Sequence, residues 1–415
     1  MLELRENIPA DQLNAYVAKS PSVHYMKTSM WAAFRRSMER DTSAYLGFYD
    51  QGRLVACAMV LQNTWMGHSF LYIPWGPCMD YDNLPLVEEV FSLLKGYADQ
   101  KKVQFLRVDP NVVRCHHAID GSLLADGFNH EAVSEKLKAI GYTHKGYGYA
   151  YNGSWTNRYT LIVDLSADEK TILSRFSRQR KTSLNRHAVK GISTHIGTKA
   201  DIPALMEFER MLAEQDGFKP HSRRFFEQLL DCFGAHAVLY VTEIDFEKAK
   251  AGLYAEIHSD KYKHDANAMA SMEQHYQDVI ALAQKYGTRK VLACGLFIRY
   301  GDMSWDLYTY NDKNLFYLQP VDNLHYFAMR DMKAHGVLRY DMVGFSGTAD
   351  PKDPYYGLYA YKRSFGPEFI EQIGEFDYVR APFAMKRFRF EKLAVNHIKR
   401  RWWTWCYKKS RKCSR

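Results

Sequence analysis

The 415-residue sequence lacks the features that mark membrane-spanning and secreted proteins. No run approaches the roughly 18 uninterrupted apolar residues of a spanning helix. The opening MLELRENIPADQ has acids where a signal peptide has an apolar segment. Cysteine is scarce: the seven cysteines are scattered without a CxxC pair, which argues against zinc-binding repeats and a disulfide framework. These absences predict a protein of the reducing cytoplasm.

The common catalytic motifs are also missing. The sequence has no GxxxxGKS/T or GxGxxG loop for nucleotide phosphates and no HExxH or GxSxG motif. It also lacks the Gln/Arg-x-x-Gly-x-Gly turn expected of an acetyl-CoA acetyltransferase. A reaction that needs no metal, organic cofactor or protein nucleophile stays open, because positioning and charge stabilisation alone can accelerate it.

Positive charge is concentrated in the tail KRRWWTWCYKKSRKCSR (399–415). The tail has eight Lys or Arg and no acid, and so accounts for eight of the nine net positive charges. Its three Trp and its cations suit the inner surface of a membrane, although the same residues suit stacking on single-stranded RNA. We expect peripheral docking at the inner leaflet.

Helix and strand patterns run through the chain twice. The first pass has a hairpin at 44–62 around Asp50-Gln51-Gly52, a strand from 70, a helix at 84–102 and a strand at 103–110. The second has a strand at 158–166, a capping box of Ser166 and Glu169, a strand at 236–244, a hairpin at 291–310, a helix at 323–336 and a strand at 338–345. The pattern predicts a mixed α/β (α+β) chain with domains at 1–155, completed by about 373–395, and 156–372, before a tail at 396–415.

The second domain carries an inserted segment at 246–287. Met269, Met272, Tyr276, Val279, Ala283 and Tyr286 follow alternating spacings of three and four, which is a heptad seam. The spacing predicts a short antiparallel helical hairpin. Two ordinary surface helices remain the alternative.

A run of cations with no acid marks residues 175–191. On one helix, Arg175, Arg178 and Arg186 would share a side. This is typical of a phosphate-contacting surface for RNA or pyrophosphate, or of a solvated helix face, which composition alone slightly favours. The predicted phosphate or RNA contacts are Arg178, Arg180, Lys181 and Arg186.

Three stretches in order resemble one family. They are YIPWGPCMD (72–80), the strand and basic helix of 158–192, and YDMVGFSG (340–347) followed by GLYAYKRSFG (357–366). Together they resemble the FemABX and MurM-type peptidoglycan branching transferases. The resemblance implies two acetyltransferase-like (GNAT) domains with a coiled-coil arm. It also implies transfer of an amino acid (Gly, Ala or Ser) from aminoacyl-tRNA to the stem-peptide side-chain amine of lipid II, without metal or other cofactor.

The resemblance also implies roles for single residues. Lys362, after Tyr361, is the first catalytic candidate; its alternative is a solvent-facing strand lysine. Asp109, which follows a strand, is either a substrate-contacting acid or a turn former before Pro110. Arg35 is expected to bind the precursor's diphosphate. An equal alternative is that Arg35 is simply an exposed residue on a helix. Tyr308 is expected near the precursor, although alternating strand aromatics are more often core.

Two positions depart from the family pattern. His221 stands where the family often has Arg, so Arg223 or Arg224 is a second source of that charge. Trp75 replaces the usual basic residue of the Y-x-P-R/K-G-P segment. Two other functions remain open: an acyl-CoA N-acyltransferase on the same fold, and a non-enzymatic RNA- or membrane-binding protein.

Overall fold

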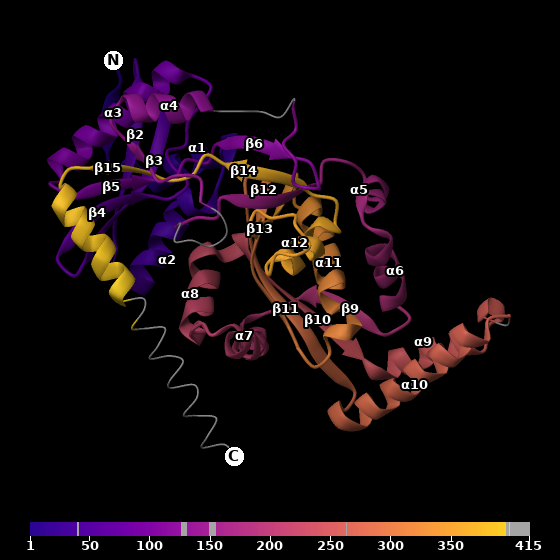
Figure 1. Ribbon diagram of the computed structural model, residues 1–415. Helices are drawn as coiled ribbons and strands as arrows, with labels where there is room; N and C mark the ends of the chain where they lie inside the picture. The colour runs from indigo at the N-terminus through magenta and orange to yellow at the C-terminus, as the bar shows by residue number, and fades with distance from the viewer. Residues whose placement is uncertain (40, 126–130, 149–154, 263, 396–397, 399–415) are drawn as a thin grey trace.

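The computed structural model describes residues 1–39, 41–125, 131–148, 155–262, 264–395 and 398. Within these residues the chain forms two mixed sheets with helices around them (Figure 1), so the predicted α/β class is confirmed. The first sheet has the order β1-β2-β3-β4-β5-β15-β7, with β1 (Glu3–Glu6), β2 (Thr42–Asp50), β3 (Arg53–Trp65), β4 (His68–Ile73), β5 (Phe105–Val108), β15 (Phe376–Val379) and β7 (Thr143–His144).

The second sheet has the order β6-β14-β8-β13-β12-β11-β10-β9. Its strands are β6 (Val113–His117), β14 (Glu368–Gln372), β8 (Tyr159–Asp164), β13 (Arg339–Gly344), β12 (Met303–Asn311), β11 (Arg289–Tyr300), β10 (Ala237–Asp245) and β9 (Ile192–Ile196). The chain passes between the two sheets four times, from β5 to β6, from β6 to β7, from β7 to β8 and from β14 to β15. The range 1–155 therefore contributes β6 to the second sheet, and the range 373–395 returns β15 to the first.

Helices cover the outer faces and fill the space between the sheets. In the first unit these are α1 (Ala10–Lys19), α2 (Ser29–Glu39), α3 (Leu84–Gln100), α4 (Glu131–Ala139) and a helix over 382–395. In the second they are α5 (Glu169–Arg175), α6 (Arg178–His187), α7 (Ile202–Asp216), α8 (Arg223–Phe233), α9 (Phe246–Ile257), α10 (Ala266–Tyr286), α11 (Pro320–Ala334) and α12 (Tyr356–Arg363).

One apolar core is shared by both units. Leu13 of α1 and Phe34 of α2 pack in the same buried cluster as Phe208 of α7, Phe226 of α8 and Trp305 of β12. This shared cluster holds the two sheets together, because removing apolar side chains from water is the main stabilising contribution to a fold. Separate cores lie under α3 and α4 in the first unit and under α11 in the second.

Among the described residues, each sheet contains one parallel strand pair. β12 and β13 pair from Met303↔Arg339 to Trp305↔Asp341 and then diverge. β4 and β5 pair from Phe70↔Phe105 to Ile73↔Val108, where both strands end. The carboxyl ends of parallel strands are favoured ligand-binding places in α/β proteins, so the chain has two candidate positions for a site.

The predicted insert is a helical hairpin, α9 and α10, that projects from the second unit (Figure 1). The seam residues Met272, Tyr276, Val279, Ala283 and Tyr286 pack into a cluster with α9 and β11. The helical-hairpin prediction is therefore confirmed. The seam residues of α10 pack partly on α9 and partly on the body of the second unit.

Two local predictions are wrong. Asp168 caps α5 by accepting from Thr171 N at 2.8 Å, so the capping residue is Asp168 and not Ser166. The predicted basic helix breaks at Phe176, and Ser177 caps a new helix, α6. Arg175 therefore ends α5 and does not share a helix with Arg178 and Arg186.

Candidate active site

A cavity of about 580 Å³ lies where β12 and β13 separate. Its walls come from Asp306–Asn311 of β12, Met342–Gly344 of β13, the start of α11, and α12. Four residues singled out in the sequence lie in this wall: Arg180, Tyr308, Tyr361 and Lys362. The fold therefore brings together groups separated by almost 200 positions in the chain.

Lys362 is buried in a helix and is not a solvent-facing strand lysine. Its Nζ lies 2.5 Å from the carbonyl oxygen of Met342 and 3.1 Å from those of Val343 and Gly344. An ammonium has three N–H donors, so these carbonyls match its full donor set. Lys362 can donate to a substrate oxygen only by releasing one carbonyl, whereas its charge acts on the cavity in either case.

The carbonyls converge because β13 ends in an unusual turn. Val343 has φ of 60°, a conformation that is costly for a β-branched residue. Its backbone N–H donates to Asp341 Oδ1 at 2.7 Å, which holds the turn. Gly344 lies so close to Asn157 that an added Cβ would come within 2.1 Å of Asn157 Cγ. Strain of this kind collects at functional sites.

Two buried carboxyl groups accompany the ammonium. Burial raises the pKa of Asp306 to about 6, with Lys362 acting in the opposite direction. Burial also raises the pKa of Asp341 to about 6, and hydrogen bonds from Thr160 and Val343 N act against it. Burial lowers the pKa of Lys362, and these two carboxylates oppose that shift. Lys362 therefore lies beside two carboxyl groups whose raised pKa suits proton uptake close to neutral pH.

A second charged group lies in the same wall. Arg180 is buried, forms an ion pair with Asp322, and stands over the Tyr361 ring with Cζ 5.0 Å from its centroid. Among the described residues, Arg180 Nε and Asp322 Oδ2 have no hydrogen-bond partner. A buried polar atom without a partner is costly, so these two atoms are candidates for ligand contacts.

Tyr308 connects the cavity to α8. Its ring lies 5.1 Å from that of His221 and 5.7 Å from that of Phe225. His221 Nδ1 lies 2.5 Å from Oε1 of the fully buried Glu209, which also accepts from the Tyr310 hydroxyl at 3.2 Å. The position where the family often has Arg is therefore occupied by a histidine that is bound to a carboxylate.

Arg35 and Arg223 lie outside the cavity. Arg35 Nε donates to Asp41 Oδ2 at 2.8 Å, and its Nη1 donates to Glu39 Oε1 at 3.0 Å. Arg223 is exposed and donates to Glu227 Oε1 at 2.7 Å. α2 still packs on α8 through Phe34 and Phe225, whose ring centroids are 5.2 Å apart. A phosphate bound by Arg35 would have to displace acidic partners.

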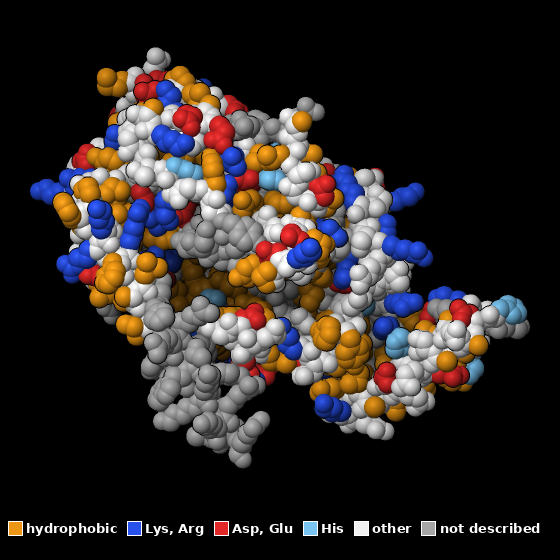
Figure 2. Space-filling view, in the orientation of Figure 1, with side chains coloured by type: hydrophobic (Ala, Val, Ile, Leu, Met, Phe, Trp, Pro, Cys, Tyr) orange, Lys and Arg blue, Asp and Glu red, His pale blue; other side chains and the backbone are white. Residues whose placement is uncertain are grey.

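A basic groove of about 550 Å³ runs beside α6. Arg178, Arg186 and Lys190 line it, and Gln319 lines both this groove and the cavity of Lys362. Figure 2 shows Lys and Arg side chains gathered over α5 and α6. Lys181 does not line the groove and donates to Ser174 O at 3.2 Å, while Arg180 points into the cavity. The cationic segment thus divides its charges between two surfaces.

Asp109 lies at the end of the other parallel pair, in the first sheet. Its carboxylate accepts from the Tyr72 hydroxyl at 2.8 Å and from Trp75 N at 2.9 Å. Burial, with Glu375 nearby, raises the pKa of Asp109 to about 7. Trp75, with φ of 57°, stacks on His24 at 4.2 Å and leaves only about 110 Å³ beside Asp109. Asp109 lines this small opening and is not part of the wall of the cavity that holds Lys362.

The FemAB family model matches residues 8–392 of the chain. The chain belongs to the FemAB family. The lipid II:glycine glycyltransferase of Staphylococcus aureus (strain MRSA252) is 23% identical over 408 residues, which cover 90% of this chain and 92% of that protein. The same protein from strain USA300 gives the same identity and coverage.

The crystal structure of FemX shows the fold shared with this FemAB-family chain. It superimposes with a TM-score of 0.78 at 21% sequence identity, covering 92% of this chain and 99% of FemX. A tandem GNAT protein of clavulanic acid biosynthesis aligns over 92% of this chain with a TM-score of 0.47, too low to support an argument. The family predicted from three sequence motifs is therefore confirmed.

Several residues of the site in this FemAB-family chain were missed by sequence reasoning. Asp341 ends the paired stretch of β12 and β13, and Asp306 directly follows it. An acid near the carboxyl end of each of two adjacent parallel strands was the available signal for the first two. Nothing local in the sequence marks Asp322, since it contacts Arg180 only through the fold.

Proposed function

We propose that this FemAB-family transferase moves an amino acid from aminoacyl-tRNA to the stem-peptide side-chain amine of lipid II or a related peptidoglycan precursor. Formation of a peptide bond is the reaction class of its family. The observation that supports the proposal is the continuity at Gln319 between the basic groove and the cavity of Lys362. A charged RNA needs a cationic track for its phosphates next to a pocket for its acylated end.

The cavity suits an aminoacyl ester. Such an ester carries an α-ammonium, for which the unpartnered Asp322 Oδ2 is an acceptor, and an ester carbonyl, which develops negative charge during aminolysis. The Lys362 ammonium provides the positive charge that stabilises this oxyanion. Arg178, Arg186 and Lys190 then bind backbone phosphates of the tRNA.

Aminolysis also needs a proton acceptor. The attacking amine loses a proton as its nitrogen bonds to the ester carbon. The ribose oxygen leaves as the C–O bond breaks, and it gains a proton to become the free hydroxyl. Asp306 lines the cavity with a pKa raised by burial to about 6, which suits uptake of that proton near neutral pH. We assign this role to Asp306 because Asp109 lies in the other sheet.

The acceptor reaches the cavity past Tyr308. This residue lies in the cavity wall and contacts the α8 ring of Phe225, which packs on α2. A precursor lying between α2 and α8 would therefore bring its stem peptide toward Lys362. Arg35, His221 and Arg223 remain its proposed polar contacts on that side.

The precursor is anchored in a membrane, and the chain needs access to it. No helix in the described part of the chain is long and apolar enough to cross a membrane. The tail 399–415 lies outside the described residues, and we propose that its Trp and basic residues dock on anionic lipid at the inner leaflet.

A transfer assay with defined substrates tests the proposed function. Purified protein, lipid II and labelled glycyl-, alanyl- or seryl-tRNA should give labelled lipid II with at least one of the three. Acetyl-CoA in place of the tRNA serves as the control for an acyl-CoA enzyme and should give no product. Transfer from acetyl-CoA alone, or no transfer with any charged tRNA, would contradict the proposal.

A further inference from the structure

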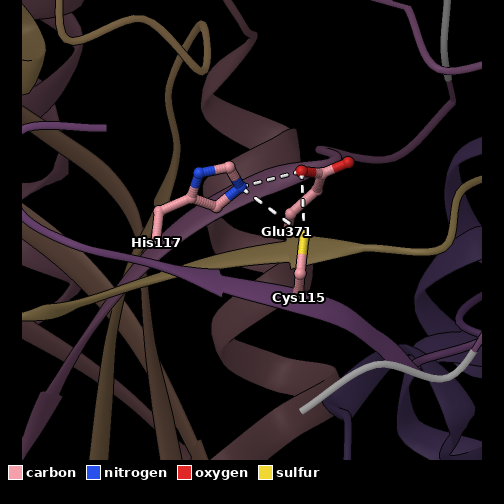
Figure 3. A group of neighbouring side chains, drawn as sticks. All are labelled: Cys115, His117 and Glu371. Atoms are coloured by element: carbon pink, nitrogen blue, oxygen red, sulfur yellow. Dashed lines mark hydrogen bonds and ion pairs between the residues drawn. The ribbon is translucent and has the colours of Figure 1, made fainter. Parts of the chain in front are cut away.

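A compact group of potential metal ligands lies outside the active site. Cys115 and His117 project from β6 and Glu371 projects from the adjacent β14, all toward one point (Figure 3). Their ligand atoms lie within 4.8 Å of one another. We propose that these three side chains bind one zinc ion.

The distances fit zinc with little adjustment. Zn–S of about 2.3 Å and Zn–N of about 2.0 Å place the two ligand atoms about 3.5 Å apart in a tetrahedron. Cys115 Sγ and His117 Nε2 are 3.6 Å apart. Glu371 Oε2 lies 3.2 Å from Sγ and 2.8 Å from Nε2, so a carboxylate movement of about 0.5 Å completes the geometry.

Neighbouring groups orient the ligands. His117 Nδ1 lies 3.0 Å from Gly121 O, and a carbonyl only accepts, so the proton is on Nδ1. In the neutral imidazole Nε2 is then a bare lone pair facing a carboxylate oxygen, and these two atoms repel unless a proton or a metal ion lies between them. Glu371 Oε1 is held by Arg114 at 2.6 Å and by Arg158. This is the outer support that fixes ligand orientation in zinc sites.

The two guanidiniums also limit which ions fit. Their positive charge disfavours a cation, so the ion must be one that a thiolate and a carboxylate together attract strongly. Mixed S, N and O ligands favour zinc over magnesium or calcium, which prefer oxygen alone. Three protein ligands leave one coordination position for water.

The location suggests a structural effect. Along the chain, β6 lies between β5 and β7 of the first sheet, and β14 precedes β15 of the first sheet. Three of the four passages between the sheets therefore begin or end at this ladder. An ion shared by β6 and β14 would tie these passages together. The opposite face of the ladder, with His116 and Ile370, lines a separate cavity of about 770 Å³ between the units.

The test measures metal binding by the full chain and does not depend on transfer activity. The chelator-treated protein is titrated with Co²⁺, which reports thiolate ligation by charge-transfer absorption, and then with Zn²⁺ in competition. We expect one ion per chain. We also expect Zn²⁺ to raise the Tm, and Cys115→Ser to abolish the absorption and weaken Zn²⁺ binding at least about tenfold.

Matched variants control for other thiols and imidazoles. Cys232→Ser removes a half-exposed thiol in α8, and His116→Gln changes the histidine next to the site that faces the other way. Both should bind Zn²⁺ like the wild type, whereas His117→Gln should not. Circular dichroism checks that each variant is folded. The proposed site would be wrong if the wild type failed to bind one equivalent of Zn²⁺. It would also be wrong if the folded Cys115→Ser and His117→Gln variants bound Zn²⁺ as tightly as the wild type.

Discussion

The buried Lys362 ammonium lies 3.1 Å from the carbonyl oxygen of Val343, a β-branched residue with φ of 60°. The left-handed backbone turns this carbonyl and those of Met342 and Gly344 toward one point, and the ammonium there satisfies them. Strain and charge therefore support each other: without the turn the ammonium would have fewer acceptors, and without the ammonium the carbonyls would repel.

Gly344→Ala should disturb this arrangement directly. Its Cβ would come within 2.1 Å of Asn157 Cγ, so the backbone has to move. We expect a loss of at least about 1 kcal/mol in unfolding free energy and a lower transfer rate. Gly357→Ala, in the same helix as Lys362, is the control, because its Cβ meets no heavy atom within 4 Å. Equal effects of the two changes on denaturant unfolding and transfer would contradict the assigned role of the turn.

Asp109 should make stability fall as pH rises. Burial raises its pKa from 3.8 to about 7, so the folded chain holds this proton more tightly than the unfolded chain. The contribution is complete below pH 3.8 and is lost as the pH rises through about 7. Asp109→Asn should flatten the profile of unfolding free energy between these limits by about 1–3 kcal/mol. Denaturant titrations at pH 4, 6 and 8 measure this, and an unchanged slope would contradict the assignment.

Changes in the basic groove should alter the KM for aminoacyl-tRNA and not the KM for lipid II. Arg178→Ala together with Arg186→Ala removes two phosphate contacts, so the KM for aminoacyl-tRNA should rise about tenfold or more and its salt dependence should weaken. The KM for lipid II should stay constant. Lys181→Ala, on the same helix but outside the groove, should change neither value. A large effect of Lys181→Ala would mean that the tRNA lies elsewhere.

Deletion of residues 399–415 should separate membrane access from chemistry. We expect weaker binding to anionic vesicles, since each basic residue near the surface contributes about 1 kcal/mol. Transfer to lipid II should slow more than transfer to a soluble precursor with the same stem peptide. Equal slowing with both acceptors would assign the tail to tRNA, and no slowing would leave it without a role in transfer.

Local structure was largely predictable from the sequence. The hairpin around Gly52, the heptad pattern of α10 and the strands at 103–110 and 338–345 follow from periodicity and turn residues, which act over a few positions. The break at Phe176 was not predictable. Ser177 caps the new helix α6, but a single serine is a weak signal inside a segment whose pattern also fits one continuous helix.

The site was predictable only in part. Motifs identified Lys362, and position in the fold explains why Arg180 faces the cavity while Lys181 does not. Arg180 and Lys181 are neighbours on α6, so their opposite directions depend on which face of the helix packs on α11. Tertiary packing decides which face of α6 is buried, and neither composition nor charge counts reveal this.

If the chemistry occurs where β12 and β13 separate, loss of the Lys362 charge in Lys362→Met should slow single-turnover transfer. Methionine keeps much of the side-chain volume but removes the charge. With saturating aminoacyl-tRNA and lipid II, we predict a rate at least about 100-fold below wild type. Lys352→Met, at an exposed lysine in the nearby loop, should keep the wild-type rate. A folded Lys362→Met enzyme that transfers at the wild-type rate would show that the chemistry does not depend on this cavity.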